Sequence, residues 1–242
     1  MFRWLKILPL MLAVAALSVF TTSCGTTNLA QIRVVNAIPD GQPVDVYFNG
    51  TRTFKDLSFD TVQPNTSPAN YITITPGSET MQSFPPGDST DPISPSGVFS
   101  LNGSTQYTVV GVGLALSDSP PLVLTDNNTV PTSGNVEFRI INASPNSPAG
   151  GVDVYIVPPG TDITDYTPQI SALGYGQGSI YQSVPFLSSG YAVIVTAYLK
   201  KTALISQPFT SQSESITTVV LVDNQGGNNG MSQTPLVLND LN

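Results

Sequence analysis

The sequence has no histidine and a single cysteine, Cys24, among its 242 residues. The absence of histidine excludes Ser-His-Asp and Cys-His nucleophilic catalysis and removes the commonest metal ligand. A zinc or copper site built from histidine and cysteine is excluded for the same reason. One cysteine cannot form a disulfide within the chain, so the stability of the fold must come from apolar cores.

Basic residues are also few. The chain has 8 Lys and Arg against 16 Asp and Glu, and charged residues make up only 10% of it. Phosphate binding needs clustered Lys and Arg, so no nucleic acid is expected as a partner. Long helices draw on Glu, Lys, Arg and Ala for their wet faces. A chain that takes its polarity from Ser, Thr, Asn, Gln, Gly and Pro favours strands joined by turns.

The N-terminal apolar run, residues 7–20, is short for a membrane-spanning helix, which needs about 20 residues. It follows Arg3 and Lys6 and carries no charge, which is typical of an export signal and predicts a signal helix within residues 1–23. Removing the signal leaves 6 basic and 16 acidic residues, a net charge of −10. Contact with a membrane should therefore come from a lipid and not from protein charge.

Cys24 ends this signal, between the small residues Ser23 and Gly25. The arrangement resembles the bacterial lipoprotein signal, in which the cysteine after the cleavage site carries lipid. Thr21 departs from that pattern, which usually has Leu there. The resemblance implies a lipid on Cys24 and a place in the bacterial cell envelope, at the outer membrane or cell surface. The alternative is an ordinary secretory signal that leaves an unpaired thiol.

The remaining chain contains one pattern twice. Arg-Val-Val-Asn-Ala at 33–37 and Val-Asp-Val-Tyr at 44–47 return as Arg-Ile-Ile-Asn-Ala at 139–143 and Val-Asp-Val-Tyr at 152–155. Thr-Val-Val and Pro-Leu-Val-Leu recur in the same order, and the offset drifts only from 106 to 114 residues. Such a period is a whole domain and not a solenoid repeat of roughly 20 to 50 residues. We expect a tether over 24–30, one domain over 31–126, a linker over 127–135 and a second domain over 136–242.

Each copy consists of short runs rich in Val, Ile, Thr and Tyr between Gly, Pro and Asn turns, which predicts antiparallel sheet. The fold class expected is all-β, with two tandem immunoglobulin-like antiparallel β-sandwich domains after the signal helix. Residues 191–198 are almost continuously apolar and predict a strand buried on both faces or a central strand. Residues 83–96 predict an exposed loop, and residues 161–172 are expected to hold one helical turn.

The repeated motifs, with Ser-Gly-Tyr at 189–191 in the second copy, resemble the bacterial domain of unknown function called DUF4397. The resemblance covers both copies and is loosest over residues 54–96. It implies an exported or surface-attached β-sandwich and implies no catalytic activity.

Paired carboxylates about 5 to 10 Å apart could still support glycoside hydrolysis. Asp45 and Asp153 recur, but each lies in a Val-Asp-Val strand with Arg33 or Arg139 on the preceding strand. The pattern favours a cross-strand ion pair that was copied with the fold. No second carboxylate recurs close by in both copies to complete a catalytic pair, so we predict no catalytic residue.

Two further kinds of site come from side chains outside the repeated motifs. The Asp- and Asn-rich loops at 126–128 and 223–228 offer oxygen ligands, but neither has the spacing of a calcium loop that ends in a bidentate Glu. We therefore predict no metal and no cofactor. The second copy is rich in tyrosine, which can stack on sugars or peptides or lie half-buried with its hydroxyl at the rim. The candidate ligand-binding residues are Tyr166, Tyr175, Tyr181 and Tyr191.

These observations predict a lipid-anchored envelope protein with a non-catalytic role in binding, adhesion or scaffolding. Its partners would be the membrane, through the lipid on Cys24, and an envelope protein or a glycan. The alternative is a carbohydrate-active enzyme or its carbohydrate-binding accessory module.

Overall fold

The computed structural model describes residues 28–65, 70–115, 117, 119–227 and 230–241. In these residues all regular secondary structure is β, and no helix is present. The search for a helix long and apolar enough to cross a membrane, made over the same residues, found none. The predicted signal helix and Cys24 lie outside the described residues.

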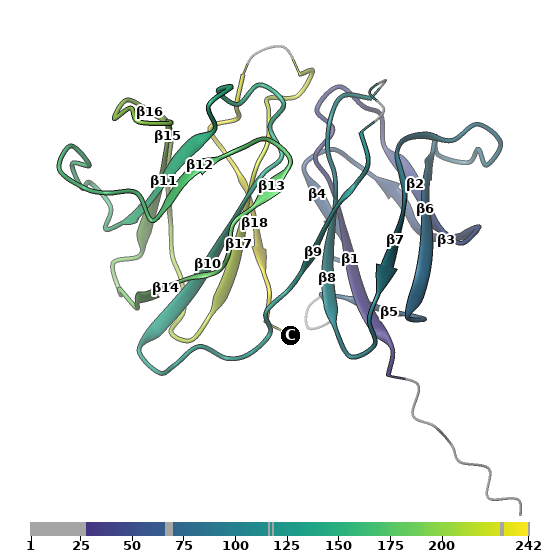
Figure 1. The fold of residues 1–242 in the computed structure, drawn as a ribbon, viewed down its shortest axis with the longest axis horizontal. Coiled ribbons are helices and arrows are strands. Elements are labelled where there is room, and N and C mark those ends of the chain that lie inside the picture. The colour runs from purple at the N-terminus through teal and green to yellow at the C-terminus, as the bar shows by residue number, and fades with distance from the viewer. Residues whose placement is uncertain (1–27, 66–69, 116, 118, 228–229, 242) are drawn as a thin grey trace, which may run out of the picture.

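The N-terminal half of the chain forms two sheets (Figure 1). Its inner sheet has the strand order β4-β1-β8-β9, with β5 also paired to β1, and its outer sheet has the order β3-β2-β6-β7. The strands are β1 (Ala30–Asn36), β2 (Val44–Phe48), β3 (Thr51–Leu57), β4 (Thr61–Gln63), β5 (Ile72–Ile74), β6 (Gly77–Phe84), β7 (Ile93–Leu101), β8 (Gln106–Gly111) and β9 (Leu122–Thr125).

The C-terminal half repeats this arrangement. Its inner sheet has the order β13-β10-β17-β18, with β14 paired to β10, and its outer sheet has the order β12-β11-β15-β16. The strands are β10 (Asn135–Asn142), β11 (Val152–Val157), β12 (Ile170–Leu173), β13 (Gln177–Gly178), β14 (Gln182–Pro185), β15 (Tyr191–Ala197), β16 (Ala203–Phe209), β17 (Ile216–Leu221) and β18 (Leu236–Asn239).

Side-chain alternation along the inner strands supplies apolar cores on both faces of each inner sheet. On β1, Ile32 and Val34 point into the core that the inner and outer sheets of the N-terminal half enclose. Val35 on the same strand joins a different core, together with Ile141 of β10 and Val220 of β17. The two inner sheets therefore pack against each other, and the halves are joined through a buried apolar interface (Figure 1).

The sheets are mixed, which corrects the prediction of antiparallel sheet throughout. β1 pairs with β8 in parallel, and β10 pairs with β17 in parallel. The remaining strand pairs are antiparallel. A parallel pair needs a crossover connection, and in each half the outer sheet lies within that connection.

Strand β15 confirms the prediction of a central strand, because Tyr191 to Thr196 are all buried and β15 pairs with both β11 and β16. The predicted helical turn within 161–172 is wrong: this segment is loop and turn until β12 begins at Ile170. The loop predicted over 83–96 is shorter than expected, since β6 ends at Phe84 and β7 begins at Ile93.

Candidate functional site

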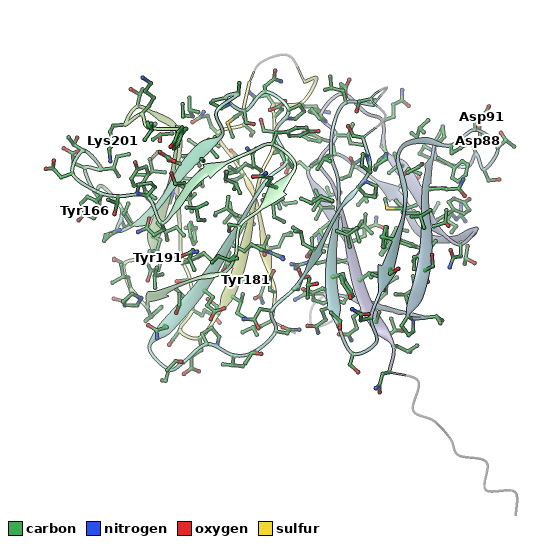
Figure 2. The ribbon with its side chains drawn as sticks, in the orientation of Figure 1. Asp88, Asp91, Tyr166, Tyr181, Tyr191 and Lys201 are labelled. Carbon is green, nitrogen blue, oxygen red and sulfur yellow. The ribbon has the colours of Figure 1, made fainter. Side chains whose placement is uncertain are left out.

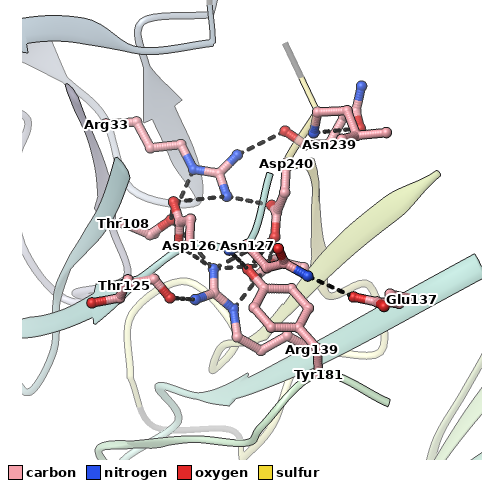
Figure 3. Close-up of polar contacts among 12 residues, drawn as sticks. Arg33, Thr108, Thr125, Asp126, Asn127, Glu137, Arg139, Tyr181, Asn239 and Asp240 are labelled. Atoms are coloured by element: carbon pink, nitrogen blue, oxygen red, sulfur yellow. Dashed lines mark hydrogen bonds and ion pairs between the residues drawn. The ribbon is translucent and has the colours of Figure 1, made fainter. Parts of the chain in front are cut away.

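A cluster of buried charges lies between the two inner sheets (Figure 3). Arg33, on β1, donates from Nε to Thr108 Oγ1 at 2.9 Å and from Nη1 to the carbonyl oxygen of Asn239 at 2.8 Å. Its Nη2 donates to Asp240 Oδ1, and Asp126 Oδ2 lies 3.7 Å from the same nitrogen. An arginine of the N-terminal half thus binds the carboxylate that follows the last strand of the C-terminal half.

Arg139, on β10, makes the reciprocal set of contacts. Its Nη2 donates to Asp126 Oδ1 at 2.6 Å, and Asp240 Oδ2 lies 3.7 Å away. Its Nε donates to Thr218 Oγ1 at 3.1 Å and its Nη1 to the carbonyl oxygen of Thr125 at 3.1 Å. The two halves are therefore related by an approximate two-fold exchange in which each arginine binds a carboxylate of the other half.

Hydroxyl groups complete the cluster. Thr108 Oγ1 and Tyr71 Oη donate to Asp126 Oδ2 at 2.6 and 2.8 Å. Thr218 Oγ1 and Tyr181 Oη both donate to Asp240 Oδ2 at 2.6 Å. The guanidinium groups also lie over the tyrosine rings, Arg33 at 4.9 Å from the Tyr71 centroid and Arg139 at 4.8 Å from that of Tyr181.

The charged groups of the cluster are buried and paired with one another. Burial by itself lowers the pKa of Arg33, but the charges of Asp240 and Asp126 outweigh it and raise that pKa above its ordinary value. Burial raises the pKa of Tyr71 and of Tyr181, so both hydroxyls stay donors. The arginine and aspartate side chains are 2% and 0% exposed. Because these side chains are shielded from water and their charges are paired, the cluster joins the two halves.

The predicted cross-strand pairs of Arg33 with Asp45 and of Arg139 with Asp153 are wrong. Successive side chains of a strand point to opposite faces, and Asp45 lies on the outer face of its sheet, away from Arg33. Asp45 accepts from the backbone amides of Asp56 at 2.9 Å and Gly87 at 3.2 Å, and from Arg52 Nη1 at 3.2 Å.

Asp153 makes equivalent contacts in the C-terminal half. It accepts from the amide of Ala172 at 2.9 Å, the hydroxyl of Ser171 at 2.7 Å and the amide of Leu199 at 2.9 Å. Burial opposes ionisation of Asp45 and of Asp153, but these hydrogen bonds prevail and lower both pKa values. Each repeated aspartate therefore holds an edge strand of its outer sheet, β3 or β12, and a neighbouring turn, at Gly87 or Leu199.

Sequence reasoning missed the partners of the two arginines, although the repeat contains their signal. Pro-Leu-Val-Leu is followed in both copies by one residue and then an aspartate, Asp126 or Asp240. Tyr71 and Tyr181 are also equivalent, since each precedes the strand that pairs with the start of β1 or β10. Strand pattern alone gives no distance between copies, so this recurrence could not be read as a contact.

Figure 2 shows three of the four candidate tyrosines, Tyr166, Tyr181 and Tyr191, which do not form one surface. Tyr181 belongs to the charge cluster, and Tyr191 is buried, with its hydroxyl donating to the carbonyl oxygen of Pro185. Tyr166 and Tyr175 are 47% and 40% exposed. Tyr166 lies at the outer end of the C-terminal half, where Lys201 Nζ donates to its carbonyl oxygen (Figure 2).

The carboxylates of the two loops considered for calcium are engaged by protein donors. Asp126 belongs to the charge cluster. Asp223 is fully buried and accepts from the hydroxyl of Ser144 and from the side-chain amide of Asn146 at 2.6 Å.

Two clefts open between the halves, and the approximate two-fold exchange relates them. The larger, of about 470 Å³, lies between the turn that precedes β4 and the segment that follows β17. Its lining residues are Gly41, Pro43, Ser58, Phe59, Asp60, Asp223, Asn224, Gln225 and Ser232. The smaller, of about 250 Å³, lies between Tyr175 and Gly176, which precede β13, and the β8–β9 connection.

Asp60 is the unusual group of the larger cleft. Its Oδ1 is buried and accepts no hydrogen bond from any described residue, and burial raises its pKa to about 6. Burial disfavours the ionised form of a carboxyl group. Carboxyl groups with raised pKa values are common at binding and catalytic sites.

Comparisons with known proteins add a family and little more. No curated protein matches the chain. A solved structure described as "Alpha-glucan binding by a streptococcal virulence factor" is 10% identical over 85% of this chain and 95% of that one, with a TM-score of 0.29. A leucine-rich repeat protein from Bacteroides thetaiotaomicron is 12% identical over 81% of this chain and 26% of its own, with a TM-score of 0.17. Both TM-scores are too low to assign a fold or a function.

The profile of one family matches residues 30–155, from the start of β1 to within β11. This span is about half of the chain and includes the first copy, the linker and both opening motifs of the second copy. The chain belongs to the family described as "Domain of unknown function (DUF4397)".

Proposed function

We propose that this chain is a lipid-anchored protein of the bacterial cell envelope with a non-catalytic role in binding or scaffolding. The observation that carries the proposal is the use of the repeated polar side chains. Arg33, Arg139 and their aspartates are buried between the halves, and Asp45 and Asp153 hold the edge strands β3 and β12. The polar side chains that recur in both copies thus have structural contacts. They leave no solvent-accessible pair of carboxylates among these groups.

The architecture that accompanies this proposal is a pair of tandem immunoglobulin-like sandwich domains held as one body. Each half has its own core between an inner and an outer sheet, and a third core joins the halves. A single fixed body of this kind suits a scaffold, since the spacing between its ends does not depend on a flexible linker.

The proposed anchor gives this body an orientation. β1 starts at the lower end of Figure 1 and runs upward, so the β1–β2 connection and the larger cleft lie at the upper end. Cys24 precedes the first residue of β1 by six positions. A lipid there would hold the lower end at the membrane, and the cleft would face away from it.

Metabolic labelling with radioactive palmitate tests the anchor in a bacterial host. We expect label on the wild-type chain and on the control Thr26→Ser, and none on Cys24→Ser. An unlabelled wild-type chain would refute the anchor, as would undiminished label on Cys24→Ser.

The rival proposal, a carbohydrate-active enzyme, needs carboxylates that substrate can reach. Asp153 is 2% exposed and accepts three hydrogen bonds from its own half, which supports the non-catalytic role. A hydrolysis screen on neutral and acidic polysaccharides separates the two. Turnover that Asp153→Asn abolishes without unfolding the chain would favour the enzyme, and absence of turnover would favour the binding protein.

A further inference from the structure

We infer that the larger cleft binds a neutral saccharide, with the Asp60 carboxylate as its central hydrogen-bond acceptor. The inference rests on the proposed binding role and gives that role a site and a ligand class. The first support is the position of the cleft between the two halves. The turn of Ser58 to Asp60 comes from one half, and residues 223–225 with Ser232 come from the other. Clefts between packed units are a preferred position for ligand sites, and about 470 Å³ falls within the usual 300 to 1,000 Å³.

The second support is a comparison with the related cleft of the same molecule. The strand register pairs Asn36 with Thr61 and Asn142 with Gln177, so Asp60 and Gly176 are equivalent residues. Their amides donate to the carbonyl oxygens of Asn36 and Asn142 at 2.8 Å in both cases.

Both residues have left-handed backbone, with φ of 57° at Asp60 and 71° at Gly176. Glycine adopts this conformation freely, and aspartate is one of the few L residues that tolerate it. The chain therefore has a carboxylate side chain at 60 where the equivalent position has none.

The third support is the state of the carboxylate. Asp60 Oδ1 has no donor among the described residues, although it is shielded from water. A buried acceptor without a donor destabilises the fold and needs an explanation, of which a ligand contact is one. Asp60 lines the cleft, so a rotation of its side chain on binding would present this oxygen to a ligand hydroxyl group.

The remaining lining defines the ligand class. Ser58, Gln225 and Ser232 can each donate and accept, while Pro43 and Phe59 give an apolar wall. No lysine or arginine lines the cleft, so an anionic ligand is disfavoured. A sugar ring has hydroxyl groups along its edge and C–H groups on its face, which matches a polar site with one apolar wall.

A calcium ion fits the cleft less well. Ca²⁺ takes about six to eight oxygen ligands. The buried carboxylate of Asp223 lines the same cleft, but it already accepts from Ser144 and Asn146. Only Asp60 has a carboxylate oxygen without a partner in this lining.

The test is a glycan array of neutral oligomers of glucose, galactose, mannose and N-acetylglucosamine, probed with the full chain in detergent. Calorimetry then measures the affinity for the best binder. Asp60→Asn removes the charge, and Asp60→Gly copies Gly176. Asp56→Asn is the matched control, because Asp56 has a φ of 50° in the same half and is 53% exposed outside the cleft.

We expect wild type and Asp56→Asn to bind a neutral oligosaccharide equally, and both Asp60 variants to bind it about ten- to a hundredfold more weakly. Asp60→Asn should also melt no earlier than wild type, which separates loss of a ligand contact from loss of the fold. Equal binding by wild type and both Asp60 variants would move the site elsewhere and leave the proposed binding role intact. Absence of any glycan binding, or Asp60-dependent binding of CaCl₂ alone, would overturn the inference. Hydrolysis of a bound glycan would instead contradict the non-catalytic role.

Discussion

Replacing Arg33 by methionine should destabilise the whole chain, because it breaks a buried ion pair between the halves. Methionine keeps most of the aliphatic stem but loses the hydrogen bonds to Thr108, Asn239 and Asp240. Asp240 would keep its two hydroxyl donors at 2.6 Å and Arg139 at 3.7 Å, yet the cluster would hold one uncompensated negative charge at 0% exposure. Removal of one partner from a buried pair costs about 3 to 5 kcal/mol.

This loss is large against a total stability of about 5 to 15 kcal/mol, so urea denaturation followed by far-UV circular dichroism should detect it readily. The matched control is Lys55→Met. Lys55 lies 3.2 Å from Asp56, but the two side chains are 65% and 53% exposed, and such a pair contributes at most about 1 kcal/mol. An Arg33→Met chain within about 1 kcal/mol of wild type would refute the structural role assigned to the cluster.

A double-mutant cycle tests whether Arg33 acts through Asp240. Asp240→Asn alone leaves the cluster with an excess positive charge and should cost a similar amount. The double variant Arg33→Met/Asp240→Asn has no net buried charge, so its loss should fall short of the sum of the single losses by about 1 to 3 kcal/mol. Strict additivity would mean that the two side chains do not interact.

Two further predictions concern the other buried carboxylates. Asp60→Asn should stabilise the chain at pH 8 by about 1 kcal/mol, a value discounted for the partial exposure of Asp60, because it removes a charge without a donor. Folding raises the pKa of Asp60 from 3.8 to about 6. The free energy of unfolding of wild type should therefore increase relative to that of Asp60→Asn as the pH falls from 6 to 4. Thermal melts that show a constant difference between the two proteins across this range would contradict the assignment. Asp153→Asn should cost about 1 to 3 kcal/mol through the lost contacts to Ala172 of β12 and to Leu199 in the turn after β15. Because folding lowers the pKa of Asp153, its carboxylate stabilises the fold at pH values above the ordinary pKa of aspartate. This stabilisation should be lost as the pH falls below that value, and the same thermal melts measure the loss.

The strands that sequence predicted well are those with apolar side chains on a regular period. β1, β8, β10, β15 and β17 fall where the runs of Val, Ile and Tyr predict them. Two strands of the outer sheet lack such a period: β3 has the sequence TRTFKDL, and β6 has GSETMQSF. Only every second or third residue of such strands is buried, so the apolar signal is too weak to separate them from loops.

The erroneous helical turn and the erroneous ion pairs have a common physical cause. Residues 161–169 are held by groups from elsewhere in the fold, for example by Lys201 Nζ, which donates to the carbonyl oxygen of Ile163 at 2.9 Å. Arg33 and Asp240 are 207 residues apart. Local pattern has no information on contacts of this kind, and Asp45, the carboxylate that the repeated motif offered as a partner, lies on the outer face of a different sheet.

The sequence by itself determined the all-β character, the duplication and the absence of histidine chemistry, because composition and period express local preferences and the supply of side chains. Tertiary structure decided how the copies meet. It brought Arg33 to Asp240 and Arg139 to Asp126, and it left Asp60 without a donor in a cleft whose walls come from both halves. These features depend on the packing of two inner sheets against each other, and packing is fixed by the complementarity of whole surfaces, which no segment of the chain specifies alone.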